Sequence, residues 1–209
     1  FVANESVSIV GDGDVEITGD SGNGIEVRVD NVTLRSINVT EFDHGGTTSS
    51  NGIYVVDDAS TIDNLTITDV SATQSERGLW VSETTTVTDL TITESHFDGN
   101  AKEGIYVAKK SDTEVTADGV HISDTSLSNN GEKGLYAERL ENATLDNLDV
   151  IGSGTDPDSY PSNKDAFNGI DLNLKYGDYS NVTIEDSTIR GSGLVGESAA
   201  NWSGALVIK

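Results

Sequence analysis

Several acidic residues and two lysines follow neighbouring repeats of the chain. Side chains of these types can carry out acid–base chemistry. Asp57 and Asp58 follow one copy of a glycine-led motif, and Glu83 follows the next copy. Hydrolysis of a glycosidic bond needs two carboxyl groups, one of which donates a proton. Proton removal beside a uronic acid needs a base, together with a cation that neutralises the substrate carboxylate. Lys109 and Lys110 follow the copy after that, so acidic and basic side chains meet beside these neighbouring repeats. The catalytic candidates are therefore Lys109, Lys110, Asp57, Asp58 and Glu83.

Two pairs of aspartates are the candidates for binding a cation. Asp12 and Asp14 lie in a Gly-Asp-Gly-Asp turn, and Asp156 and Asp158 form a similar pair. Carboxylate oxygens of this kind are the ligands that calcium prefers. The sequence contains neither a twelve-residue calcium loop nor a nonapeptide calcium repeat, so we expect no required cofactor, with calcium or another cation as an optional ligand.

The elements that must position these groups are marked by a repeated motif of glycine, an aliphatic residue, a variable residue and a second aliphatic or small residue. Successive motif glycines are separated by 28, 26, 26, 30, 35 and 35 residues. A period of this size, with abundant β-branched residues and little proline, predicts coils that stack on one another. The motif glycines are Gly24, Gly52, Gly78, Gly104, Gly134, Gly169 and Gly204.

The variable position of the motif points away from the core, because side chains alternate along a strand. In chain order this position holds Glu26, Tyr54, Trp80, Tyr106, Tyr136, Asp171 and Leu206. The four consecutive aromatic residues allow two interpretations. They form a flat surface for sugar rings or a protein partner, or they stack as packing beneath a loop. The long segments 152–168 and 191–203 lead into the last two motifs. They either wall a groove beside that surface or are insertions without a functional role.

Two further strands are predicted in each repeat. The second strand shows aliphatic–polar alternation, at Val32–Leu34, Leu65–Ile67, Leu90–Ile92, Val120–Ile122, Leu148–Val150 and Val182–Ile184. The third strand contributes one large apolar residue, clearest at Val70, Phe97, Leu127 and Ile189. Alternation of this type indicates strands with one buried face. The prediction is an all-β solenoid of about seven coils, each with three short strands, spanning residues 1–209 as a single domain or as part of a longer solenoid.

This pattern resembles the right-handed parallel β-helix of pectin-lyase-like proteins, with their short parallel β-helix repeats. The resemblance covers nearly the whole chain and implies the fold. It implies little about activity, because lyases, hydrolases, tailspikes and adhesins share the fold. Motifs such as a Gly-His-Gly turn or Asp-Pro-His are absent, and we expect His44, His96 and His121 to be ordinary surface residues. No catalytic residue is therefore assigned.

Asparagine or aspartate precedes most of the predicted second strands, where such residues tolerate turn geometry and can hydrogen-bond along a stack. These residues are Asn31, Asn64, Asp89, Asn147 and Asn181. The sequons at Asn31, Asn64 and Asn181 are therefore interpreted as structural. The sequons outside this row are the glycosylation candidates, at Asn4, Asn38, Asn142 and Asn201.

The chain carries 36 acidic and 12 basic residues, a formal net charge of −24. This charge disfavours nucleic acid and anionic membranes as partners, and it suggests either adaptation to high salt or an extracellular acidic protein. Cysteine is absent, which excludes disulfides, and no apolar run reaches the ~20 residues that cross a bilayer. An extracellular or cell-surface location is the expectation.

The two ends suggest self-association. Val7–Ile9 and Val15–Ile17 are interpreted as second and third strands without a first strand, and Gly204–Lys209 as a first strand without successors. One copy's tail could then complete the coil begun by the next copy's head, unless the chain is a piece of a longer β-helix. The predicted function is a non-enzymatic structural or adhesive rod, with head-to-tail filament formation as one form of it. The alternative is a polysaccharide-active enzyme or an inactive glycan-binding relative.

Overall fold

The computed structural model describes residues 1–42, 50–56, 61–107, 116–155, 167–174, 179–193 and 204–208. Several predicted site residues lie outside these ranges, together with the interiors of segments 152–168 and 191–203. The residues concerned are His44, Asp57, Asp58, Lys109, Lys110, Asp156, Asp158 and Asn201.

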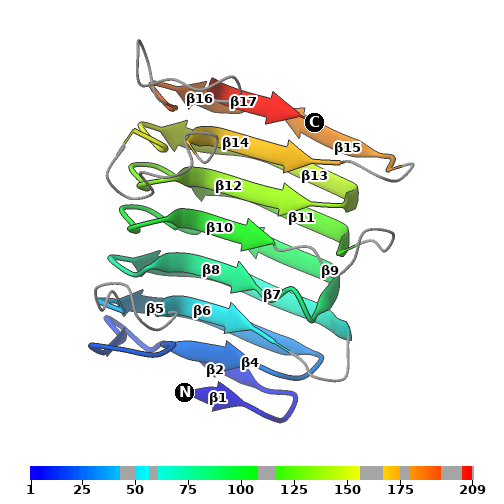
Figure 1. The fold of residues 1–209 in the computed structure, drawn as a ribbon. Coiled ribbons are helices and arrows are strands. Elements are labelled where there is room, and N and C mark those ends of the chain that lie inside the picture. Colours follow the sequence, from blue (N-terminus) through cyan, green and yellow to red (C-terminus); the bar gives the residue numbers. More distant parts are fainter. Residues whose placement is uncertain are drawn as a thin grey trace.

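The described residues form two parallel β-sheets that wind together into a coil and contain no helix (Figure 1). Sheet A has the order β1-β4-β6-β8-β10-β12-β14-β17 and sheet B the order β15-β13-β11-β9-β7-β5-β2, with β3 on β5 and β16 on β13. Strands that neighbour each other in a sheet are about one repeat apart in the sequence, so the chain climbs one coil per repeat. This confirms the predicted all-β parallel β-helix.

Sheet A contains β1 (Val2–Ala3), β4 (Ile25–Val27), β6 (Asn51–Val55), β8 (Arg77–Val81), β10 (Glu103–Val107), β12 (Lys133–Glu138), β14 (Asn168–Asn173) and β17 (Gly204–Ile208). Sheet B contains β2 (Ser8–Val10), β3 (Glu16–Thr18), β5 (Val32–Thr40), β7 (Thr61–Thr73), β9 (Thr86–Thr93), β11 (Ala117–Ser126), β13 (Leu140–Ile151), β15 (Val182–Glu185) and β16 (Thr188–Arg190).

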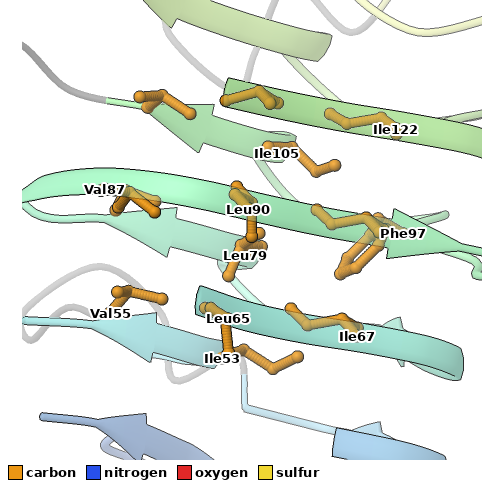
Figure 2. Packing of buried hydrophobic residues seen from close by; sticks show 14 of the residues in the cluster. Ile53, Val55, Leu65, Ile67, Leu79, Val87, Leu90, Phe97, Ile105 and Ile122 are labelled. Atoms are coloured by element: carbon orange, nitrogen blue, oxygen red, sulfur yellow. The ribbon is translucent and has the colours of Figure 1, made fainter. Parts of the chain in front are cut away.

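The core lies between the two sheets and is built from aliphatic residues that stack coil over coil. Ile53, Leu79 and Ile105 occupy equivalent positions in β6, β8 and β10. Leu65 and Leu90 face them from β7 and β9, as Figure 2 shows. Burying a side chain of this size contributes about 1.5–3 kcal/mol. Eight aliphatic residues of the first and second strands are at most 2 % exposed, as the alternation predicts: Ile53, Leu65, Ile67, Leu79, Leu90, Ile92, Ile105 and Ile122.

The motif glycines are required because successive coils approach closely at this point. A Cβ atom on Gly104 would lie 2.7 Å from the carbonyl oxygen of Gly134 and 2.7 Å from that of Phe97. The same clash with the next motif glycine would occur at Gly52, Gly78 and Gly134. Backbone atoms cannot move aside as a flexible side chain can, so the repeat of glycine in the sequence records a repeat of close backbone contact.

The predicted second and third strands are joined more closely than expected. In β5, β7, β11 and β13 they form one continuous strand, in which one bend residue with positive φ stands between the second-strand and third-strand parts. One left-handed residue turns the chain, and pairing with the next coil resumes directly after it, so a separate third sheet is not formed. The bend residues are Ser36, Asp69, Glu94, Asp124, Asn147 and Asp186, with φ between 45° and 54°.

The row of asparagines differs from the prediction at one coil. Ala143 pairs with Val120 and Val182, so Ala143–Leu145 is the second strand of that coil and Leu148–Val150 belongs after the bend. Asn142 therefore lies in the row, in place of Asn147. Its side-chain amide donates to Asp118, and its carbonyl oxygen accepts a hydrogen bond from Asn181.

Both ends also differ from the prediction. Val2 and Ala3 pair with Glu26 and Val27, so the first coil has its own first strand and does not need one from another copy. At the other end Leu206 pairs with Ile170, which places Val207 opposite Asp171. The motif in the last coil is thus shifted by one residue, and Leu206 is not at the outward motif position.

Candidate functional site

Four aromatic side chains form a continuous row on the outer face of sheet A. Tyr54, Trp80, Tyr106 and Tyr136 occupy equivalent positions in β6, β8, β10 and β12, and we call them the aromatic strip. Ring centroids are 4.7 Å apart for Tyr54–Trp80, 6.5 Å for Trp80–Tyr106 and 5.1 Å for Tyr106–Tyr136. The strands are neighbours in one sheet, so the row runs across them and along the axis of the coil.

Each ring of the aromatic strip is half-buried, which leaves part of its surface accessible. The indole Nε1 of Trp80 has no hydrogen-bond partner among the described residues. The Tyr136 hydroxyl donates to Glu138 and accepts from the Asn173 amide at 3.4 Å. Burial, reinforced by the nearby charge of Glu103, raises the pKa of Tyr106 to about 12, and burial also raises the pKa of Tyr136. Both tyrosines therefore remain neutral hydrogen-bonding groups at any physiological pH.

Six charged residues border the aromatic strip where β8, β10 and β12 begin. Adjacent pairs of opposite sign precede three consecutive motif glycines, and the order of the signs reverses from each coil to the next. We call them the charged block: Glu76, Arg77, Lys102, Glu103, Glu132 and Lys133. Because equivalent positions stack, each side chain has residues of opposite sign beside it and above or below it.

Four members of the charged block are joined in one continuous network. Arg77 Nε donates to Glu103 Oε2 at 2.7 Å, and Arg77 Nη1 donates to Glu76 Oε1 at 3.1 Å. Lys102 Nζ donates to the same Glu76 oxygen at 2.5 Å. Burial alone would raise the pKa of Glu76, but its bonds to Lys102 and the charge of Arg77 bring that pKa below its ordinary value. Glu76 is therefore an ionised partner in the network.

Two cations of the charged block also support the aromatic strip. The Arg77 guanidinium carbon lies 5.2 Å from the ring centre of Trp80 and 5.0 Å from that of Tyr106. Lys133 Nζ lies 4.5 Å from the ring centre of Tyr136. A cation over an aromatic face at this distance is attracted to it. Arg77, held in turn by Glu76 and Glu103, fixes the two central rings of the strip.

Glu132 is the member of the charged block that the network leaves incomplete. Its side chain is 5 % exposed, and its Oε1 atom has no hydrogen-bond partner in the described part of the chain. Burial is the main cause that raises the pKa of Glu132 to about 8, and the charge of Glu103 adds to it. Lys133, Lys102 and Arg77 oppose this shift without cancelling it. At neutral pH Glu132 therefore carries a proton.

A polar hollow of about 510 Å³ lies over the turns that lead into the charged block. Its lining residues include Gln74, Ala101, Asn129, Gly131 and Thr155. Residues 101 and 131 directly precede Lys102 and Glu132 in the sequence. The hollow, the charged block and the centre of the aromatic strip therefore share the same coils.

The other predicted site residues are dispersed in the structure. Glu83 is exposed in the turn after β8, and Asp12 and Asp14 are exposed in the turn after β2. Among the described residues, no group of three or more His, Asp or Glu side chains is close enough to hold a metal ion. His96 and His121 are exposed, as are Asn4, Asn38 and Asn142. The amide of Asn142 donates to Asp118, whereas the side chains of Asn4 and Asn38 make no hydrogen bond with another described residue.

The sequence predicted the aromatic strip but missed the charged block. A signal was present, since Glu-Arg, Lys-Glu and Glu-Lys directly precede the glycines of three consecutive motifs. The network, the perturbed Glu132 and the ring contacts of Arg77 follow from the stacking of these doublets.

The chain was compared with known proteins. Residues 2–121 and 52–208 match the family model described as a right-handed beta helix region. A comparison with curated proteins found no match. In the part of the chain that the structure describes, no helix is long and apolar enough to cross a membrane.

Proposed function

Because this chain belongs to the right-handed parallel β-helix family, whose fold alone does not define an activity, we propose from its surface that it is a non-enzymatic rod that binds a glycan. The aromatic strip is the observation that carries the proposal. Four half-buried rings in mutual contact present one continuous apolar surface within a strongly acidic protein. An extracellular or cell-surface location is part of the proposal, since glycans of the environment are met there.

A glycan fits both components of this surface. Sugar rings have an apolar face of C–H groups that packs against aromatic rings, and a rim of hydroxyl groups that need hydrogen-bond partners. The polar hollow supplies such partners through Gln74, Asn129 and Thr155 on the same coils. Binding sites commonly combine apolar contact area with a few placed polar groups in this way.

The ion pairs of the charged block favour binding over catalysis. Glu76 and Glu103 are held by Arg77 and Lys102, and a carboxylate committed to such bonds is a poor base or nucleophile. The block instead orders the rings, because Arg77 contacts both Trp80 and Tyr106. Rings fixed before binding lose less conformational entropy when the ligand arrives.

Replacing Trp80 with alanine tests this proposal. We expect Trp80→Ala to retain the β-rich circular dichroism spectrum and to lose about 2 kcal/mol of glycan affinity, because a central aromatic anchor is removed. Trp80→Phe should retain most of the affinity. The matched control is Thr91→Ala, a half-exposed residue of the same coil on sheet B, which should bind as the unaltered protein does. Binding can be measured by calorimetry against glycans that a carbohydrate array selects. Equal binding by Trp80→Ala and the control would refute the proposal.

One observation favours a second candidate, a polysaccharide-active enzyme. Glu132 retains a proton to about pH 8, as a general acid must, and it lies beside the aromatic strip. In that case Glu132→Gln should abolish cleavage of a sugar polymer and leave glycan binding intact. Product formation followed by chromatography distinguishes the two candidates, since the binding rod releases no shorter sugars.

A further inference from the structure

We propose that the glycan bound by the aromatic strip is an extended, uncharged chain that lies along the axis of the coil, with one sugar residue over each ring. This inference rests on the proposed function and specifies its ligand. Two sets of observations support it, the arrangement of the rings and the use of the nearby charges.

The arrangement of the rings defines the direction and the extent of the ligand. One ring is supplied by each of four neighbouring strands, at centroid separations of 4.7, 6.5 and 5.1 Å. Neighbouring strands lie about 4.8 Å apart, which is close to the length of one sugar residue in an extended chain. A chain that crosses the strands therefore meets a new ring at every residue, whereas a chain that follows a single strand meets one ring only.

The row ends where the outward position becomes acidic. Below Tyr54 the equivalent residue is Glu26, which is hydrogen-bonded to Asn23 and paired with Arg28. Above Tyr136 the equivalent residue is Asp171, which is 1 % exposed and accepts from the Asn168 amide. Neither residue offers a ring, so the stacking surface is four sugar residues long.

The charges beside the row favour an uncharged ligand. A carboxylate or sulfate on the glycan would need a cation to replace its water. Arg77 is committed to Glu76 and Glu103, and Lys102 is committed to Glu76. Lys133 is 7 % exposed and lies against the ring of Tyr136. The cations described beside the four rings are thus already engaged, and Arg28, which is exposed beyond the end of the row, is paired with Glu26. The formal charge of −24 also repels a polyanion from a distance.

The protonated state of Glu132 also favours an uncharged glycan. A neutral carboxyl group can donate and accept hydrogen bonds, so it adds no further repulsion and suits a hydroxyl-rich ligand. The titratable and charged groups that act on it are Glu103, Lys133, Lys102 and Arg77.

The experiment compares oligosaccharides by length and by charge, using the whole chain. β-Linked glucose and N-acetylglucosamine oligomers of two, four and six residues are titrated by calorimetry, alongside galacturonate oligomers of the same lengths. We expect affinity for a neutral oligomer to rise about tenfold or more from two to four residues and to change little from four to six. Molar sodium chloride should leave neutral binding within about twofold, because no ion pair with the ligand is formed. Galacturonate should bind at least about tenfold more weakly than the neutral oligomer at low salt.

Variants locate the chain on the row. Tyr54→Ala removes an end ring, so it should weaken the four-residue oligomer and leave the two-residue oligomer nearly unchanged. Trp80→Ala should weaken both. Equal affinity for two and four residues, or a preference for galacturonate, would overturn the inference while the proposed function stands. Preference for galacturonate that disappears in a Lys109→Ala, Lys110→Ala variant would assign the anion site to those lysines and would equally overturn it. Failure of every glycan to bind would instead refute the proposed function.

Discussion

At the scale of single residues, Glu132 shows how a position in the stack changes the chemistry of a side chain. Glu76, Lys102 and Glu132 begin equivalent turns of three coils, joined by backbone hydrogen bonds from Lys102 to Glu76 and from Glu132 to Lys102. Glu76 ionises readily because two cations bond to it, whereas Glu132 is buried and its Oε1 atom has no hydrogen-bond partner among the residues that the structure describes. The same residue type therefore has opposite pKa shifts at two levels of one column.

The raised pKa of Glu132 predicts a pH-dependent stability. In the unfolded chain the carboxyl ionises near 4.5, whereas the folded protein holds the proton to about pH 8. Unfolding then releases a proton between these values, so the free energy of unfolding should fall as pH rises from about 4.5 to 8 and level off above that range. Glu132→Gln, which is neutral at every pH, should be more stable than the unaltered protein at pH 9 by on the order of 2 kcal/mol or more, and similar at pH 4.

Urea denaturation at pH 4, 7 and 9 measures this difference. Glu83→Gln is the control, because Glu83 is an exposed carboxylate in a turn and its substitution should change the free energy of unfolding little at any of these values. A constant difference between Glu132→Gln and the unaltered protein across this range would show that folding does not raise the pKa of Glu132.

At the scale of the strand, inward and outward residues of one segment should differ sharply in their effect on stability. Leu90 in β9 is fully buried between Leu65 and the facing strand of sheet A, whereas its neighbour Thr91 is half-exposed. Leu90→Ala should lower the free energy of unfolding by about 2–5 kcal/mol, because it leaves a cavity in a closely packed core. Thr91→Ala should change it by about 0.5 kcal/mol or less.

Chemical denaturation of the two variants checks this pair. Hydrogen exchange should place the increased opening of Leu90→Ala in β7, β9 and β11, since each coil contacts mainly its neighbours. Uniform loss of protection along the whole chain would contradict this local coupling.

At the scale of the whole molecule, the net charge should make stability depend on salt. A charge of −24 on one elongated coil repels itself, and unfolding relieves the repulsion by separating the charges. The exposed ion pairs that salt weakens contribute about 1 kcal/mol or less each, so the screening of repulsion should dominate. We expect the melting temperature to rise from low salt to molar sodium or potassium chloride, and with millimolar calcium. An unchanged melting temperature would remove the interpretation as salt adaptation.

Head-to-tail association is the second expectation at this scale. Apolar side chains are exposed at both ends of the coil, with Phe1 60 % and Ile208 59 % exposed, and β1 and β17 each have one partner strand among the described residues. Unpaired edges of this kind promote association between copies. Ile208→Asp should reduce concentration-dependent association in sedimentation experiments at molar salt, and Trp80→Ala on the side face should not. A monomer at all concentrations would contradict the filament form of the proposed rod.

The sequence alone determined the features that depend on alternation and period. The inward positions of Ile53, Leu79 and Ile105 and the outward row of Tyr54, Trp80, Tyr106 and Tyr136 follow from a motif that repeats once per coil. A strand admits only two faces, so one motif in register fixes which residues stack. The motif glycines from Gly24 to Gly169 belong to this class, because their close contact with the backbone of the next coil recurs at each of them.

Only the tertiary structure decided which of two similar asparagine-led segments forms the second strand of its coil. Asn142 and Asn147 each precede an alternating apolar segment and each adopts positive φ, so the residues near them do not distinguish the row from the bend. Ala143 pairs with Val120 and Val182 of the neighbouring coils, and this pairing places Asn142 in the row and Asn147 at the bend. The charged block has the same origin. Its doublets are separated by 26 and 30 residues in the sequence, and their burial and ion pairing arise only when the coils bring them within about one strand spacing of each other.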